Sequence, residues 1–135
     1  MADELMLEIV TPEKMIFSDK IEEVTLPGTE GEFGVLRGHE AFLSSLNVGE
    51  MNFIKDGKKT YYAVNVGYAE VTADKVTVLI ETAEKSDEID KERAQRAKDN
   101  AESKLNQLNK EDVEFVVVHA ALTRAMARLS AAERQ

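Results

Sequence analysis

The stretch EGEFGVLRGHEAF, residues 30–42, places three glycines, three acidic residues and one histidine in thirteen positions. A loop that cradles phosphate joins a strand to a helix N-terminus and keeps negative side chains away. Here Glu30 and Glu32 lie among the glycines, no Lys-Ser or Lys-Thr pair follows, and the flanking segments have strand character. The glycines are therefore expected to supply positive φ or close backbone approach at the corners of strands.

On both sides of this stretch, the first 84 residues predict short strands separated by turns. Val76, Val78 and Ile80 alternate with the residues between them, as expected for a half-buried strand. Pro27-Gly28 suits a type II turn, and Asp56-Gly57 is a strong hairpin signal. The segments with this character are LMLEIV, IEEVTL, EFGVL, EMNFIK, TYYAVNV, GYAEV and KVTVLIET. They predict an antiparallel β-sandwich over residues 1–84.

From residue 85 to residue 135 the apolar period becomes helical. Ser86 or Asp87 is the expected cap of a first helix, and NKED at residues 109–112 has the shape of a capping box that starts a second. A short break between two helices of similar length implies an antiparallel hairpin. The fold class is α+β, mainly β, with the sandwich followed by this hairpin. The apolar positions are Ile89, Ala94, Ala97, Ala101, Leu105 and Leu108, then Phe115, Val118, Leu122, Ala125 or Met126, and Leu129.

The apolar seam of the first predicted helix consists mostly of alanine. Burying an alanine methyl contributes only about 0.8 kcal/mol, against roughly 1.5–3 kcal/mol for a Leu or Val side chain. A hairpin of about 50 residues without a disulfide or a metal is also marginal as an independent unit. The hairpin is therefore expected to rest weakly on the sandwich or on a partner, and to be able to exchange one for the other.

Composition and charge exclude several classes of function. The formal net charge is −9, so nucleic acid and anionic membrane surfaces are not expected as partners. The first 83 residues carry a net charge of −8 and the remainder −1, so the two parts differ in electrostatics. No run approaches the roughly 20 consecutive apolar residues of a membrane span, and the N-terminus has acids where a signal peptide carries bases. We expect a soluble chain without direct membrane insertion.

No catalytic or metal site is predicted. His39 has no Ser nucleophile in an adjoining motif, and the chain contains no Cys. The other histidine, His119, belongs to the second predicted helix, and two histidines do not complete a zinc site. The acidic residues show no calcium-loop spacing. His39 is expected to be structural or part of an interface.

Several segments resemble the epsilon subunit of bacterial F-type ATP synthases. They are PGTEGEFGVLRGH at residues 27–39, LNVG at 46–49, NVGYAEV at 65–71, VTVL at 76–79 and the helical tail. The resemblance spans essentially the whole chain. One departure is Arg37, where the family usually has proline before Gly-His, which relaxes a single turn constraint.

The resemblance implies a β-sandwich followed by two helices, and a non-catalytic rotor subunit that couples proton flow to ATP synthesis. It implies the gamma subunit and the c ring as partners, with the C-terminal helices able to reach the alpha/beta catalytic hexamer and restrain ATP hydrolysis. The implied location is peripheral, at the cytoplasmic face of the bacterial inner membrane. The implied c-ring and gamma interface residues are Glu30, Gly31, Arg37, Gly38, His39 and Glu40.

A second motif, IDKERA at residues 89–94, matches the I/L-D-x-x-R-A pattern of epsilon subunits that resemble ATP sensors. No cofactor is required, but a regulatory ATP, with magnesium, is implied. Arg124 and Arg128 are four apart on the second helix, and a guanidinium fork suits a triphosphate. The implied ATP-binding residues are Ile89, Asp90, Arg93, Ala94, Arg124 and Arg128.

The sequence alone leaves two alternatives open. Asp90 and Arg93 can form a solvated ion pair worth roughly 0.3–0.5 kcal/mol, with the arginines of the second helix facing acidic loops of the catalytic subunits. Asn100 also stands where better nucleotide-binding members carry a base. The alternative function is a stand-alone nucleotide-sensing module without a rotary partner. Met51, Phe53, Tyr61, Tyr62 and Tyr68 are either core or interface.

Overall fold

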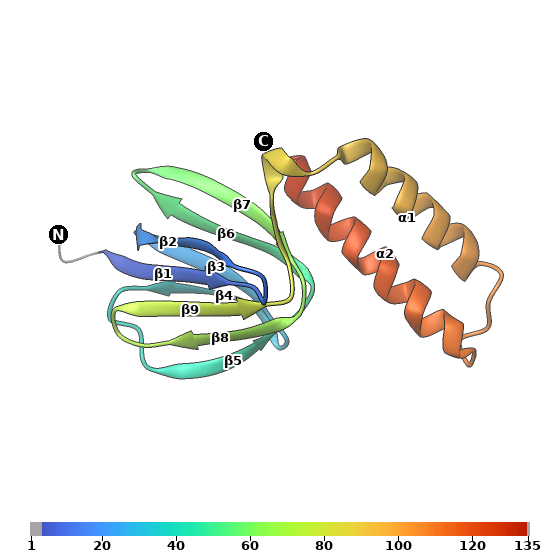
Figure 1. Cartoon of the computed structure of the whole chain (residues 1–135). Helices are drawn as coiled ribbons and strands as arrows, with labels where there is room; N and C mark the ends of the chain where they lie inside the picture. Colours follow the sequence, from blue (N-terminus) through green and yellow to red (C-terminus); the bar gives the residue numbers. More distant parts are fainter. Residues whose placement is uncertain (1–3, 135) are drawn as a thin grey trace.

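The computed structural model describes residues 4–134 as a body of strands from which two helices project (Figure 1). The 3-10 helix η1 (Ser86–Glu88) leads from the strands into α1 (Lys91–Leu105) and α2 (Val113–Ala132). The predicted sandwich and helical hairpin are confirmed. Within the described residues the strands are β1 (Leu5–Val10), β2 (Met15–Ile21), β3 (Glu23–Gly28), β4 (Gly31–Leu36), β5 (Phe42–Leu46), β6 (Gly49–Lys55), β7 (Lys58–Val64), β8 (Gly67–Val71), β9 (Lys75–Ile80) and β10 (Ala83–Lys85).

The strands form one folded-over sheet in the order β10-β7-β6-β3-β5-β8-β9-β1-β2, with β4 paired to β3. Their pairs are antiparallel except for β1 and β9, which run parallel with Leu7 opposite Val76. This pair brings together the first strand and a late one, which no hairpin connects, so its direction is not fixed by a turn. The parallel pair joins the β1–β2 hairpin to the rest of the sheet.

Alternate residues of the strands point inward and form a single core. Leu5, Leu7 and Ile9 of β1 are fully buried, and Val76 and Val78 of β9 lie beside them. The period-2 burial is the one that the alternating sequence predicts. Among the five residues that the sequence leaves between core and interface, Met51, Phe53 and Tyr62 belong to this core, Tyr61 is half-buried, and Tyr68 is exposed.

The turns agree with the sequence at one predicted place and differ at another. Asp56 and Gly57 both have positive φ, 52° and 76°, and connect β6 to β7 as predicted. Pro27-Gly28, expected as a turn, instead forms the end of β3, and the chain turns at Thr29 and Glu30. Gly31, with φ of 130°, supplies the unusual backbone conformation there. The positive φ expected at Gly28 is therefore found three positions later.

The helix caps differ from the predicted ones. Ser86 and Asp87 belong to η1, and the N-cap of α1 is Asp90, whose Oδ1 accepts a hydrogen bond from the Arg93 backbone N–H at 3.1 Å. The second helix begins at Val113 after Asp112, later than the capping-box shape suggested. Asp112 does accept from the backbone N–H of Asn109 at 3.1 Å, which is half of a capping box.

The hairpin meets the sandwich through one end of α2. α1 packs along α2, while α2 contacts β6, β7 and η1, and Figure 1 shows α1 on the outer side. The buried cluster at this contact consists of Ala63, Ile89, Ala131 and Ala132, separate from the sandwich core. α2 is long and apolar enough to cross a membrane by length and composition alone, but a third of that window is buried by the rest of the chain.

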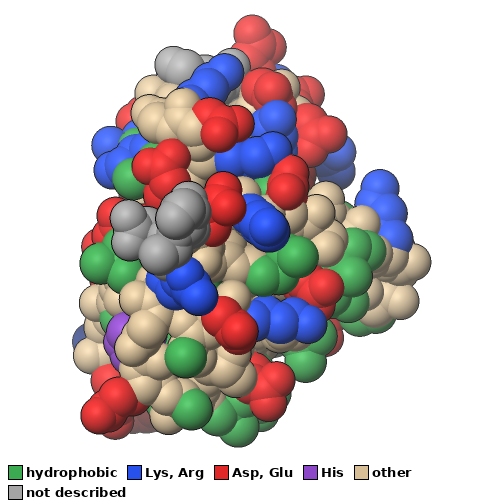
Figure 2. Space-filling model, turned by 90° about the vertical axis from the view of Figure 1, so that its left-hand side faces the viewer, with side chains coloured by type: hydrophobic (Ala, Val, Ile, Leu, Met, Phe, Trp, Pro, Cys, Tyr) green, Lys and Arg blue, Asp and Glu red, His purple; other side chains and the backbone are tan. Residues whose placement is uncertain are grey.

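Charges are mixed over the end of the sandwich that faces away from the helices. Figure 2 shows acidic and basic side chains interspersed there, with small hydrophobic areas between them. Extended contact with a polyanion requires clustered Lys and Arg. The described residues visible on this face form no such cluster.

Candidate functional site

A cavity of about 320 Å³ lies at the junction between the sandwich and the hairpin. It is bounded by the segment that enters α1 and by the C-terminal half of α2. Its lining residues are Glu84, Glu88, Ile89, Asp90, Arg93, Ala94, Ala97 and Arg128. Five of the six residues implied as ATP-binding therefore meet in one place, although 34 positions separate Ala94 from Arg128 in the sequence.

Local structure fixes the helical side of this junction cavity. Capping by Asp90 starts α1 at Lys91, so Arg93 and Ala94 lie in its first turn. Ile89 and Ala94 are buried and form the apolar part of the wall. The carboxylate of Asp90 thus already has a structural task, satisfying a backbone N–H that a helix start leaves without a partner. No Asp90–Arg93 side-chain ion pair is formed within the bridging distance of 4.0 Å.

The charges in the junction cavity are nearly balanced. Arg128 Nε lies 2.5 Å from Glu84 Oε1 in an ion pair that is partly open to solvent. The lining holds three carboxylates, on Glu84, Glu88 and Asp90, and two guanidinium groups, so the formal charge is −1. A phosphate group that uses Arg128 must displace Glu84, or must arrive with a divalent cation that offsets the carboxylates.

Arg124 lies outside this cavity. It lines a neighbouring space of about 10 Å³ against the sandwich, together with Arg128, Ala63 and Glu84. The two arginines are four residues apart on one side of α2, but only Arg128 also lines the junction cavity. In this arrangement of the hairpin the two arginines meet at a space too small for a triphosphate, and Arg124 does not reach the junction cavity.

The loop implied as the c-ring interface surrounds β4. Glu30, Gly31 and His39 line one cavity of about 560 Å³ between β4 and β5, whereas Arg37, Gly38 and Glu40 do not line it. Gly38 has φ of 88°, and its N–H donates to Ala73 O at 2.6 Å, which ties the loop to the β8–β9 turn.

His39 contacts a backbone carbonyl and an aromatic ring. Nδ1 of His39 lies 2.9 Å from Glu40 O, and its ring packs 5.0 Å from that of Phe42. His119 lies far along the chain on α2, beside the ring of Phe115. Within residues 4–134 neither imidazole has a hydroxyl nucleophile among these contacts, as a general base for such a nucleophile requires. Residues 4–134 contain no group of three or more potential metal-ligating side chains.

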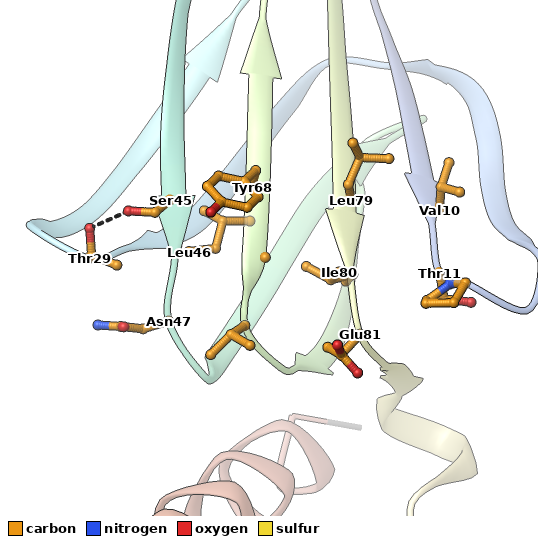
Figure 3. Close-up of a pocket in the computed structure, with 13 residues that line it drawn as sticks. Val10, Thr11, Thr29, Ser45, Leu46, Asn47, Tyr68, Leu79, Ile80 and Glu81 are labelled. Atoms are coloured by element: carbon orange, nitrogen blue, oxygen red, sulfur yellow. Dashed lines mark hydrogen bonds between the residues drawn. The ribbon is translucent and has the colours of Figure 1, made fainter.

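An apolar groove of about 620 Å³ lies on the outer face of β5, β8, β9 and β1 (Figure 3). Tyr68 and Leu79 stand opposite each other on β8 and β9, with Ser45 and Val10 continuing the row on β5 and β1. Tyr68 is 57% exposed and Leu79 50%. Val66 and Pro12 add further apolar surface to the groove. Exposed apolar side chains gathered in this way are typical of a protein interface.

The sequence contains a signal for this groove that a search for simple alternation misses. Val78, Leu79 and Ile80 are consecutive apolar residues, so β9 has apolar side chains on both of its faces. Val78 and Ile80 face the core, which leaves Leu79 on the outside. A continuous apolar run is typical of a strand that is covered on both faces, yet within residues 4–134 half of the Leu79 surface stays exposed.

Comparison with known proteins covers both parts of the chain. The family model "ATP synthase, Delta/Epsilon chain, beta-sandwich domain" matches residues 4–86, and "ATP synthase, Delta/Epsilon chain, long alpha-helix domain" matches residues 87–133. The ATP synthase epsilon chain of Geotalea daltonii is 52% identical over 132 residues, covering 98% of this chain and 96% of the relative. That of Geotalea uraniireducens is 50% identical over 134 residues, covering 99% and 97%.

A solved structure has the same arrangement of strands and helices. A chain in the cryo-EM structure of the Euglena gracilis mitochondrial ATP synthase, which comprises OSCP, F1 and the c-ring, superposes with a TM-score of 0.84. The two chains share 27% sequence identity, and the match covers 96% of this chain and 81% of that one. The similarity therefore extends over the sandwich and the helices together.

Proposed function

The chain belongs to the family of ATP synthase epsilon chains, and from this premise we propose that it is a non-catalytic rotor subunit of the central stalk. It sits as a peripheral part of the complex at the cytoplasmic face of the bacterial inner membrane. There it helps to couple proton flow to ATP synthesis. Its hairpin restrains ATP hydrolysis when it leaves the sandwich.

The observation that carries the proposal is the apolar groove on the outer face of the sandwich. We assign the gamma subunit to this groove. Tyr68 and Leu79 are large, solvent-exposed and adjacent, in a chain of which 32% of the residues are charged. Aromatic side chains at the centre of an apolar patch are the usual energetic anchors of a protein interface. The loop of Glu30, His39 and Glu40 is assigned to the c ring.

The N-terminal half of α2 offers a second unpartnered surface. Val113, Val116 and Val117 are exposed and lie on one side of the helix. α2 touches the sandwich only towards its other end, where the contact is built largely from alanine methyls. We propose that the valine side meets the catalytic hexamer once the hairpin has left the sandwich, because that contact exchanges a weak apolar seam for a larger one.

Removing residues 86–135 tests this proposal in the assembled complex. We expect ATP hydrolysis by the complex containing the shortened chain to exceed that of the complex containing the full chain by at least about fivefold, as for a typical coupling free energy. The shortened chain keeps β1 to β10 and the separate sandwich core. ATPase assays on complexes of equal stoichiometry measure the difference.

Co-purification of both chains with gamma provides the control for this experiment. Equal retention of the full and the shortened chain shows that any change in hydrolysis comes from the missing helices. Unchanged hydrolysis would reduce the hairpin to a structural role. A full chain that never purifies with gamma would favour the stand-alone nucleotide sensor.

We further propose that the junction cavity binds ATP together with magnesium. Arg93 and Arg128 are the candidate phosphate ligands, and Glu84 and Glu88, which also line the cavity, are the candidate carboxylate ligands of the magnesium ion. A hydrogen bond to a charged group contributes about 1.5–3 kcal/mol, so Arg128→Ala is expected to weaken binding at least about tenfold. Titration calorimetry with ATP, with and without magnesium, measures the loss.

Arg96→Ala is the matched control for the nucleotide experiment. Arg96 is exposed on α1 and does not line the cavity. It should leave the affinity unchanged, whereas Arg93→Ala should reduce it. The absence of binding heat for the unaltered chain at millimolar magnesium-ATP would rule the nucleotide proposal out and leave the rotor proposal untouched.

A further inference from the structure

Glu50 of β6 holds the end of α2 through two donors. Ser130 Oγ donates to Glu50 Oε2 at 2.9 Å, and Arg134 Nε lies 3.4 Å from Glu50 Oε1. Each oxygen of the carboxylate thus has its own partner. The Glu50 side chain is only 17% exposed, so its contacts are less screened by solvent than those of the other ion-paired carboxylates in residues 4–134.

The backbone after α2 places these donors on one side. Arg134 follows the C-cap residue Glu133, and its backbone N–H donates to Ala131 O at 3.1 Å. The chain therefore keeps a helical path beyond the end of α2, and Arg134 projects from the same side as Ser130, four residues earlier. The guanidinium of Arg134 also lies 5.6 Å from the centre of the Tyr61 ring on β7.

The apolar part of the same contact is small. Ala131 and Ala132 are buried against Ala63 and Ile89. Alanine methyls remove little apolar surface from water, but they let the helix approach the strands closely. The polar contacts here therefore contribute a larger share of the docking free energy than they would if leucine side chains formed the apolar contact.

The second polar contact between α2 and the strands is less suited to hold the hairpin. Arg128 pairs with Glu84, but Glu84 belongs to β10, which leads directly into the helices. Its ion pair is also more exposed than Glu50. Glu50, by contrast, lies 80 residues before Ser130, so its contact closes the long loop between the sandwich and the end of the chain.

We infer that Glu50, Ser130 and Arg134 form a latch that sets how often the hairpin lifts from the sandwich. The latch is separate from the junction cavity, because none of its three residues lines it. A ligand that takes Arg128 away from Glu84 thus leaves the latch closed. The latch operates within the isolated chain, so it holds or fails independently of the partners assigned above.

Single thiols measure lifting of the hairpin directly, because the chain has no cysteine. Ala63→Cys places a thiol beneath the end of α2, and Ala69→Cys places one in the sandwich core. Both alanines are buried, at 5% and 0% exposure. Alkylation of the first thiol by iodoacetamide requires lifting of the hairpin, while alkylation of the second requires opening of the sandwich.

In the full chain, Glu50→Gln is expected to raise the alkylation rate at position 63 about tenfold and to leave the rate at position 69 unchanged. Arg134→Ala should also raise the rate at position 63. Glu50 pairs with position 63 across the strands, so Glu50→Gln removes a negative charge beside the thiol, whereas Arg134→Ala removes a positive one. An effect on the thiolate fraction would therefore change the two rates in opposite directions.

Combining Arg134→Ala with Glu50→Gln should give less than the product of the two effects, because both remove the same contact. Glu70→Gln, which removes an exposed strand carboxylate of β8, is the matched control and should change neither rate.

Three results would overturn the latch. If Glu50→Gln and Arg134→Ala left the alkylation rate at position 63 unchanged, packing of the alanines alone would hold the helix. Equal acceleration at positions 63 and 69 would place the role of Glu50 in the stability of the sandwich. The same acceleration by Glu70→Gln would reduce the effect to net charge.

Discussion

Replacement of Gly67 by alanine is expected to destabilise the sandwich by about 3 kcal/mol, a typical cost of severe overpacking. A Cβ at this position would overlap the carbonyl oxygen of Leu79 and come within 2.7 Å of Ile80 Cγ2 and 2.8 Å of Ile80 Cα. Backbone atoms of the paired strand cannot turn aside as a side chain can. The loss corresponds to a fall in Tm of about 10 °C for a chain of this size.

Gly34→Ala is the matched control for this prediction. A Cβ at Gly34 first meets Glu23 Oε2 at 3.4 Å, the far end of a flexible side chain. The free energy of unfolding should change by less than about 1 kcal/mol. Thermal unfolding followed by circular dichroism compares the two variants. Equal losses would show that glycine flexibility, and not close approach of β8 to β9, explains Gly67.

Local sequence pattern predicts most of the fold, because most strands of the sandwich alternate buried and more exposed residues. The alternation of β9 and the Asp56-Gly57 turn both give their structures from a few residues. β2 and β5 are missed because MIFSDKI and FLSSL lack a regular alternation of apolar and polar residues, and β10 is missed because its three residues are too few to show a period. The parallel pairing of β1 with β9 joins strands that are about 65 residues apart in the sequence, and no short segment encodes such a pairing.

The sequence predicts some residues of the candidate sites and misses others. The IDKERA motif leads to the junction cavity because its residues are neighbours at the start of α1, and helical spacing adds Arg128. Helical spacing also adds Arg124, which does not line that cavity, because it fixes a side of the helix but not what that side meets. The contact of Glu50 with Ser130 depends on tertiary docking across 80 residues. No periodicity relates those two positions.

Tyr68→Asp is expected to reduce binding to the gamma subunit by at least about 100-fold, because an unpaired charge buried in an interface costs several kcal/mol. The isolated chain should keep its fold, since the Tyr68 side chain points out of the sandwich into the groove (Figure 3). Leu79→Asp, directly across the strand pair, should have a similar effect. Calorimetric titration of purified gamma with each variant measures the affinity.

Met15→Asp tests whether the loss of affinity for gamma is specific to the groove or follows the loss of any exposed apolar side chain. Met15 of β2 is 50% exposed, as Leu79 is, but does not line the groove. Its replacement should leave the affinity for gamma within about threefold, since exposed positions outside an interface contribute little to binding. If Met15→Asp were as harmful as Tyr68→Asp, the partner would cover a broader face than the groove. Full affinity in the Tyr68→Asp variant would instead move gamma to another face, and the exposed row of Tyr68 and Leu79 would require a different occupant.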